Sequence, residues 1–244
     1  MLPNFFRLGL RKVRRWYKTQ VVWDNELIND LMEFFDLTLD ETIRLLKAGK
    51  KAFHMMWNAL EPRTDEEIIR FYEVSPFNVF SLAYWHMRRH QRRFRRRVIE
   101  HCYGKVLDYG GGIGDLCTEL AKRRFDVTYG DVKGKNMEFA QWRFMKKGLN
   151  VKVIDLVRDQ GLLEQYDTIL CLDVMEHVPD PKNTLNTISQ RLKPNGKLII
   201  TNLTCPGPTK QNPTHRQISF DAKQLLNSLG IFVTDKEWLW IKKS

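Results

Sequence analysis

A carboxylate and four glycines follow a short apolar stretch near the middle of the chain, and residues of these types can hold a nucleotide. The stretch reads VLDYGGGIGDL, residues 106–116. Glycine has no Cβ, so the backbone can turn tightly and approach a ligand closely. Apolar residues then recur at helical spacing, and a helix N-terminus offers free N–H groups and a positive dipole. The stretch therefore predicts a strand, a ligand-binding turn and a helix, with Asp108, Gly110, Gly112 and Gly114 at the turn.

Three later apolar runs also end in aspartates, namely Asp131, Asp155 and Asp173. The carboxyl ends of parallel strands meet at one edge of a sheet, where open α/β sheets bind ligands. Asp131 stands about twenty residues after the turn, where a carboxylate accepts hydrogen bonds from ribose hydroxyls. The turn lacks the G-x-G-x-x-G spacing of a pyrophosphate site, which disfavours a nicotinamide dinucleotide and a dehydrogenase.

A carboxylate and a histidine, Glu176 and His177, follow Asp173. A histidine beside an acceptor can take the proton of a hydroxyl, so His177 is a candidate general base. With His215 from the Pro-rich stretch 204–220, these side chains also supply oxygen and imidazole ligands for a divalent cation. In a third interpretation, Glu176 and His177 begin the next helix and brace the pocket. We rank the base and the pocket wall above the metal.

Taken jointly, the motifs resemble those of the class I S-adenosylmethionine-dependent methyltransferases. VLDYGGGIGD resembles their first motif, YGDV their ribose-binding acid and KVIDL their adenine-side acid. YDTILCLDVMEHVPDP is similar to their fourth motif with the loop after it, and RLKPNGKLIITN to the turn into their fifth strand. The D-x-x-E-H-V form looks most like the small-molecule O-methyltransferases of the ubiquinone-biosynthesis type. The resemblance covers residues 104 to about 241.

This resemblance implies an α/β fold: a Rossmann-like, doubly wound, seven-stranded, mostly parallel sheet with a helical N-terminal cap. It implies S-adenosylmethionine as cofactor and S-adenosylhomocysteine as product, with a divalent metal less favoured. The implied cofactor-binding residues are Asp108, Gly110, Gly112, Gly114, Asp131, Val132, Asp155, Leu156 and Asp173. The implied catalytic residues are Asp173, His177 and His215, and the weaker metal set is Asp173, Glu176, His177 and His215.

The chain divides into three regions on composition and periodicity. Residues 1–20 are basic with interleaved aromatic side chains, residues 21–103 read as a helical cap, and residues 104–244 alternate between strand and helix. Within the cap, Thr38 and Thr64 precede helices, Gly49 and Pro76 are predicted to end them, and residues 77–97 are predicted to form one further helix.

Charge and cysteine usage bear on partners and compartment. The formal net charge is +11, and residues 88–97 hold seven arginines and no acid. That run reads as a solvated helix face, or as a contact for phosphate, nucleic acid or anionic lipid. Residues 1–20 resemble an interfacial helix, which would make peripheral membrane contact or would equally dock on the rest of the protein. No apolar run reaches the ~20 residues of a membrane span. The four cysteines show no paired spacing, which favours a cytoplasmic protein.

The sequence as a whole predicts methyl transfer to a small-molecule or lipid-like acceptor, with oxygen as the nucleophile. An RNA methyltransferase that uses the arginine run is one alternative, although nothing in the sequence reads as an added RNA-binding module. A non-catalytic subunit that binds the cofactor and a partner is another, against which the complete set of pocket acids argues.

Overall fold

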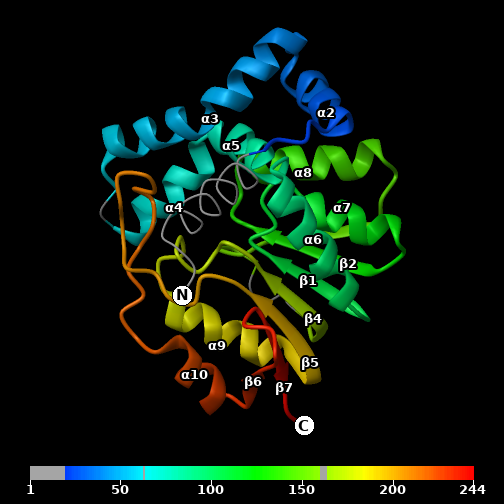
Figure 1. Ribbon diagram of the computed structural model, residues 1–244, viewed down its shortest axis with the longest axis vertical. Coiled ribbons are helices and arrows are strands. Elements are labelled where there is room, and N and C mark those ends of the chain that lie inside the picture. Colours follow the sequence, from blue (N-terminus) through cyan, green and yellow to red (C-terminus); the bar gives the residue numbers. More distant parts are fainter. Residues whose placement is uncertain (1–19, 63, 160–163) are drawn as a thin grey trace, which may run out of the picture.

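A seven-stranded sheet lies at the centre of the computed structural model, which describes residues 20–62, 64–159 and 164–244 (Figure 1). The strand order is β3-β2-β1-β4-β5-β7-β6. Strands β1 to β5 run parallel, whereas β7 is antiparallel to both β5 and β6. The predicted mostly parallel α/β sheet is thereby confirmed. The strands are β1 (Lys105–Tyr109), β2 (Asp126–Asp131), β3 (Val151–Asp155), β4 (Tyr166–Cys171), β5 (Leu192–Ile200), β6 (Ile231–Val233) and β7 (Leu239–Lys242).

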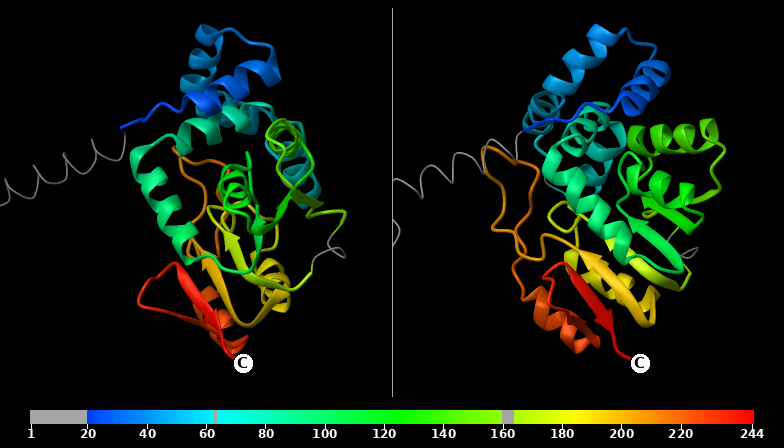
Figure 2. Two further views of the ribbon diagram at one scale, coloured as in Figure 1. Left: turned by 90° about the vertical axis from the view of Figure 1, so that its right-hand side faces the viewer. Right: turned by 45° about the vertical axis from the view of Figure 1, so that its right-hand side comes forward.

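Helices cover both faces of the sheet, because successive strand side chains point to opposite faces. Leu107 of β1 packs in a cluster with α9 and α10, whereas its neighbour Val106 packs with α6, α7 and α8. The two views of Figure 2 show these helices on either side of the strands. Their bounds are α6 (Arg89–His101), α7 (Asp115–Lys122), α8 (Lys135–Lys146), α9 (Pro181–Arg191) and α10 (Ala222–Ser228).

Within the described residues, four helices precede α6 and lie in the region predicted to be a helical cap. Figure 1 shows α2, α3 and α5 at the end of the molecule opposite β6 and β7. The cap has its own apolar cluster, which also takes in Ile113 of the glycine turn and Phe139 of α8. The cap is therefore packed directly against the glycine turn. Its helices are α2 (Asn25–Phe35), α3 (Leu39–Leu60), α4 (Asp65–Val74) and α5 (Phe77–His86).

In the cap, the sequence predicted where helices begin more accurately than where they end. Thr38 and Thr64 each cap a helix in a capping box, with Glu41 and Glu67 as the reciprocal partners. Pro76 separates α4 from α5. Gly49, however, does not end a helix: α3 continues to Leu60.

The reason that position 49 is a glycine lies in helix packing. A Cβ on Gly49 would lie 2.8 Å from the Cβ of Phe80, so its absence lets α3 approach α5. The prediction of a single helix over residues 77–97 was also wrong. This segment forms two helices, because residues 20–22 bond to the backbone between them. The Val22 N–H donates to the Met87 carbonyl, and the Arg89 N–H donates to the Gln20 carbonyl.

The predicted basic segment 1–20 lies, apart from Gln20, outside the described residues. The predicted boundary at residue 103 follows α6, and the structure packs Val98 and Ile99 of that helix in the sheet cluster. Within the described ranges, no helix is both long enough and apolar enough to cross a membrane.

Candidate cofactor and acceptor site

The glycine turn is fastened to the end of the neighbouring strand. Gly110, Gly112 and Gly114 have φ values of +77°, +56° and +73°, in the left-handed region that favours glycine. The Gly112 N–H donates to Oδ2 of Asp131 at 2.6 Å. The Gly110 N–H donates to the Gly130 carbonyl at 2.8 Å. These bonds fix the turn beside the predicted ribose-binding acid.

Packing behind the turn excludes larger residues. A Cβ on Gly114 would lie 2.8 Å from the Phe144 ring. Asp108 lies buried at the same place, and the thiol of Cys117 donates to its Oδ2 at 3.4 Å. Burial raises the pKa of Asp108 to about 6, although the charge of Arg95 acts to lower it. Asp108 therefore supports the turn from within the protein.

The carboxylate of Asp131 retains room for a ligand. Besides Gly112, the Val132 N–H donates to Oδ1 at 2.7 Å, and the Tyr129 hydroxyl lies 3.4 Å from Oδ2. A carboxylate has about four acceptor positions, so Oδ1 can accept a further hydrogen bond. Burial raises the pKa of Asp131 to about 6, although the hydrogen bonds from Gly112 and Val132 act to lower it. These features fit the hydroxyls of a ribose.

Asp155 and Leu156 lie at the end of β3, next to Asp131. Oδ1 of Asp155 accepts the Val157 N–H at 2.9 Å, and Oδ2 pairs with Arg158 at 2.7 Å. Arg158 in turn pairs with Glu73 of the cap at 2.7 Å. Burial would raise the pKa of Asp155, but the bond to Arg158 holds it below its usual value. The Leu156 N–H donates to the Asp131 carbonyl. An adenine contact through the Asp155 carboxylate stays a prediction.

Asp173 and Glu176 share one partner after β4. Oδ1 of Asp173 accepts the Asn202 side-chain amide and the Thr201 hydroxyl, each at 3.1 Å. The same Asn202 amide donates to Oε1 of Glu176. Asp173 and Asn202 both have positive φ, at +55° and +56°, a conformation that is costly for residues other than glycine and clusters at functional sites. Burial raises the pKa of Glu176 to about 8.

His177 and His215 stand together, as the sequence allowed. Their rings meet edge to face at 5.0 Å between centroids. Nδ1 of His177 lies 2.9 Å from the Tyr72 hydroxyl of α4. Burial lowers the pKa of His177 to about 3, and burial together with Lys50 lowers the pKa of His215. Both imidazoles are therefore neutral at pH 7.

Three of the four predicted metal-ligating residues come together. Donor atoms of Glu176, His177 and His215 all lie within 4.8 Å of one another. Asp173 is outside this group. Its second oxygen instead accepts the Trp85 indole N–H at 3.3 Å. The three residues could hold a divalent cation or could serve an acceptor directly.

The cap and the loop at residues 204–220 close over this edge of the sheet. Lys50 of α3 donates to Asn212 at 2.9 Å, and Arg216 pairs with Asp65 of α4 at 2.9 Å. Figure 1 shows this loop alongside α3 and α4. These contacts join the loop, which carries His215, to the cap.

Two residues of this edge were missed in the sequence. Asn202 lies two residues after the end of β5, so its place at the carboxyl end of a strand was a usable signal. His54 lies one helical turn after Lys50 on α3. Burial lowers the pKa of His54 to about 4, with contributions from Lys50 and His215, and this coupling depends on tertiary packing.

Known proteins resemble this chain in sequence and in fold. A family model described as a methyltransferase domain matches residues 84–227. The chain is 33% identical over 102 residues to the ubiquinone biosynthesis O-methyltransferase of Saccharophagus degradans, covering 41% of this chain and 43% of that one. It is 24% identical over 157 residues to the protein of the same name from Erwinia tasmaniensis, covering 59% and 65%.

The matched segments thus span about half of these relatives, between 43% and 65% of their length. The solved StiE O-MT structure, residues 961–1257, superposes with a TM-score of 0.50 at 19% identity, covering 63% of this chain and 56% of that one. That likeness shows a shared fold. Because the family model covers more than half of the chain, this protein belongs to the methyltransferase domain family, as a class I S-adenosylmethionine-dependent methyltransferase.

Proposed function

We propose that the protein methylates a hydroxyl oxygen of a small-molecule acceptor. The observation that carries this proposal is the group of Tyr72, His177 and His215 beneath the cap, beside Asp173 at the cofactor edge. Bound S-adenosylmethionine supplies an electrophilic methyl group. The protein's own tasks are then to orient the acceptor, exclude water and receive the hydroxyl proton. Relatives named as O-methyltransferases support oxygen as the nucleophile.

His215 is the better placed base of the two histidines. Tyr72 engages Nδ1 of His177, and burial drives the pKa of His177 to about 3, which makes that ring a poor proton acceptor. Burial and the charge of Lys50 lower the pKa of His215, whereas the charge of Asp173 acts to raise it. In this account the acceptor proton passes to His215, while Tyr72 and His177 position the acceptor.

A divalent cation held by Glu176, His177 and His215 is the competing chemistry at the same place. Such a cation would lower the pKa of an acceptor hydroxyl by direct contact and would make a base less necessary. Carboxylate and imidazole are suitable ligands for it. We favour the metal-free form as the simpler account; the bond between Tyr72 and Nδ1 of His177 leaves Nε2 of that ring open to either chemistry.

The acceptor is proposed to be small and partly apolar. The buried rings of Phe53 and Phe71 pack on Tyr72, with centroid distances of 6.0 Å and 5.4 Å, so Tyr72 stands in apolar surroundings beside His177. A lipid-like phenol would suit such surroundings. Peripheral membrane contact through residues 1–20, in a cytoplasmic protein, stays part of this proposal.

The test is a methyl-transfer assay on the full chain. S-Adenosylmethionine with a labelled methyl group is incubated with phenols, catechols and lipid-tailed phenols, and products are identified by mass spectrometry. We expect an O-methylated product, formed at least about a hundredfold more slowly by His215→Asn because general-base catalysis is lost. His101→Asn, whose ring contacts Trp238 at the far end of α6, is the matched control. Label that enters RNA and no small molecule would contradict the proposal.

A further inference from the structure

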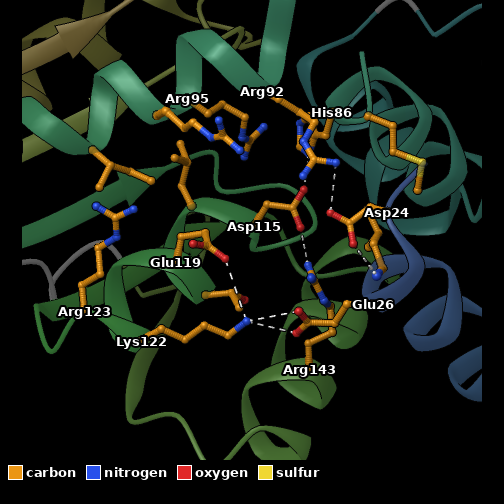
Figure 3. A pocket seen from close by; sticks show the side chains of 16 residues that line it. Asp24, Glu26, His86, Arg92, Arg95, Asp115, Glu119, Lys122, Arg123 and Arg143 are labelled. Carbon is orange, nitrogen blue, oxygen red and sulfur yellow. Dashed lines mark hydrogen bonds and ion pairs between the residues drawn. The ribbon is translucent and has the colours of Figure 1, made fainter. Parts of the chain in front are cut away.

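A cavity of about 200 Å³ lies between α2, α6 and α7, and its lining includes Asp115, which follows the glycine turn (Figure 3). Its lining includes part of the arginine run at residues 88–97, to which methyl transfer assigns no role. Its lining contains six cationic side chains, which are Arg92, Arg95, Arg96, Lys122, Arg123 and Arg143.

The acids around this cavity are already bound. Asp115 pairs with Arg143 at 2.5 Å and with His86 at 2.8 Å. Glu26 pairs with Lys122 at 3.1 Å. Asp24 accepts the Leu27 N–H as the N-cap of α2 and lies 3.6 Å from Arg92. These pairs neutralise Arg143, Lys122 and part of the charge of Arg92.

Three arginines keep their hydrogen-bonding capacity. Over residues 20–62, 64–159 and 164–244, the guanidinium groups of Arg95, Arg96 and Arg123 have no hydrogen bond or ion pair in the structure. Figure 3 shows the dashed ion pairs ending on Asp24, Glu26, Asp115 and Glu119, with none reaching Arg95 or Arg123. Arg95 influences Asp108 and Asp115 through space only. The guanidinium groups at this cavity therefore exceed the acids available to pair with them.

A buried hydroxyl completes the donor set. Thr118 of α7 lines the cavity and is 2% exposed, and its Oγ1 has no hydrogen-bond partner in the structure. A buried hydroxyl without a partner carries a desolvation cost of about 1–3 kcal/mol, which a ligand oxygen would remove. Thr118 thus offers a buried hydroxyl donor to a molecule that enters the cavity.

We infer that this cavity binds a terminal phosphate group of a small molecule. Guanidinium forks match the oxygens of phosphate bidentately, and a hydroxyl donates to a third oxygen. A terminal phosphate has three unsubstituted oxygens and can reach the buried Thr118. A nucleic-acid phosphodiester carries two bulky ester arms and is held at a surface instead. The inference is independent of methyl transfer.

The surface next to the cavity is also lined by arginines. A shallower hollow adjoins it and is lined by Val22 and by four arginines of α6, Arg89, Arg92, Arg93 and Arg96. Arg92 and Arg96 border both hollows. A second phosphate of the same molecule would lie there, so pyrophosphate is expected to bind more tightly than inorganic phosphate.

The experiment is calorimetric titration of the full chain with pyrophosphate and with inorganic phosphate at constant, physiological ionic strength. We expect one pyrophosphate per chain and a loss of at least about tenfold in affinity for Arg95→Gln and for Thr118→Val. Thr118→Ser keeps the hydroxyl and is expected to restore binding. Thr118→Val only removes an unpartnered hydroxyl, so that variant is expected to remain folded.

Arg97→Gln is the matched control, because Arg97 lies on the same helix, is exposed and does not line the cavity. Equal weakening by Arg95→Gln and Arg97→Gln would overturn the inference, since it would reveal diffuse charge attraction. Absence of pyrophosphate binding by the folded native chain would also overturn it. So would binding of a single-stranded oligonucleotide or an anionic vesicle that pyrophosphate fails to displace.

Discussion

The Tyr72 hydroxyl lies 2.9 Å from Nδ1 of His177, and this bond joins α4 of the cap to the loop after β4. Two further contacts cross the same boundary: Trp85 donates to Asp173, and Glu73 pairs with Arg158. The cap therefore forms a wall of the site, and changes in the cap should affect catalysis.

Replacing Tyr72 tests this link. We expect Tyr72→Phe to lower kcat for methyl transfer while the affinity for S-adenosylhomocysteine stays unchanged, because His177 loses its positioning bond. Stability should fall by only about 1 kcal/mol. Tyr103→Phe removes a hydroxyl that bonds to the exposed Asn195 carbonyl, and it is the control. Unchanged kcat in Tyr72→Phe would show that the cap bond has no part in the reaction.

The raised pKa of Asp131 predicts a pH dependence of cofactor binding. The ionised carboxylate accepts hydrogen bonds from ribose, and its pKa in the folded protein is about 6. Affinity for S-adenosylhomocysteine should therefore fall as the pH drops below about 6, by up to about tenfold per pH unit. Titrations across this range measure it. An equally steep fall in Asp131→Asn would assign the pH dependence to another group.

The strands and their acidic ends could be predicted because local signals are sufficient there. Apolar runs that stop at Asp131 and Asp155 identify parallel strands, and Thr38 and Thr64 announce helix starts through their own side chains. Such features depend on residues only a few positions apart.

What could not be predicted depends on contacts between distant segments. From the sequence, Gly49 was predicted to end a helix. In the structure it lies within α3, where the absence of a Cβ makes room for Phe80 of α5. The break between α5 and α6 is set by backbone bonds from residues 20–22. The pairing of Tyr72 with His177 spans 105 residues and has no local signature.

Arg143 is expected to be the most costly charged residue to remove. It is 4% exposed and donates to Asp30 at 3.0 Å, to Asp115 at 2.5 Å and to the Ile113 carbonyl at 2.8 Å. Arg143→Met removes the buried guanidinium from Asp30, which keeps Lys146 and Lys147, and from Asp115, which keeps His86. It should lower the free energy of unfolding by about 3 kcal/mol. Arg44→Met breaks an exposed pair with Asp40 and should cost little. Similar losses in the two variants, measured by urea unfolding, would refute the assignment.

The ion pair between Asp115 and Arg143 also predicts how the stability of the protein changes at acidic pH. Burial would raise the pKa of Asp115, but the charge of Arg143 and the bond to His86 hold it well below the usual value of 3.8. A depressed folded pKa gives stability that is present above the unfolded pKa and is lost as the pH falls below it. The native chain should therefore lose stability below about pH 4, and Arg143→Met should show a shallower loss.

Chelation distinguishes the two chemistries at Glu176, His177 and His215. In the metal-free account, methyl transfer persists after dialysis against EDTA, and the rate at saturating cofactor falls only when acidification protonates His215, below its ordinary value of 6.5. If activity is lost with EDTA and returns with Mg²⁺, Mn²⁺ or Zn²⁺, the three residues are metal ligands.

Binding of the cofactor is the central claim, and calorimetric titration with S-adenosylhomocysteine tests it most directly. We predict micromolar binding by the native chain and its loss in Asp131→Ala, because Asp131 is the ribose acceptor beside the Gly112 turn. Asp126→Ala removes an exposed acid at the opposite end of the same strand and should bind normally. Absence of binding by the folded native chain, or equal binding by Asp131→Ala, would contradict the account.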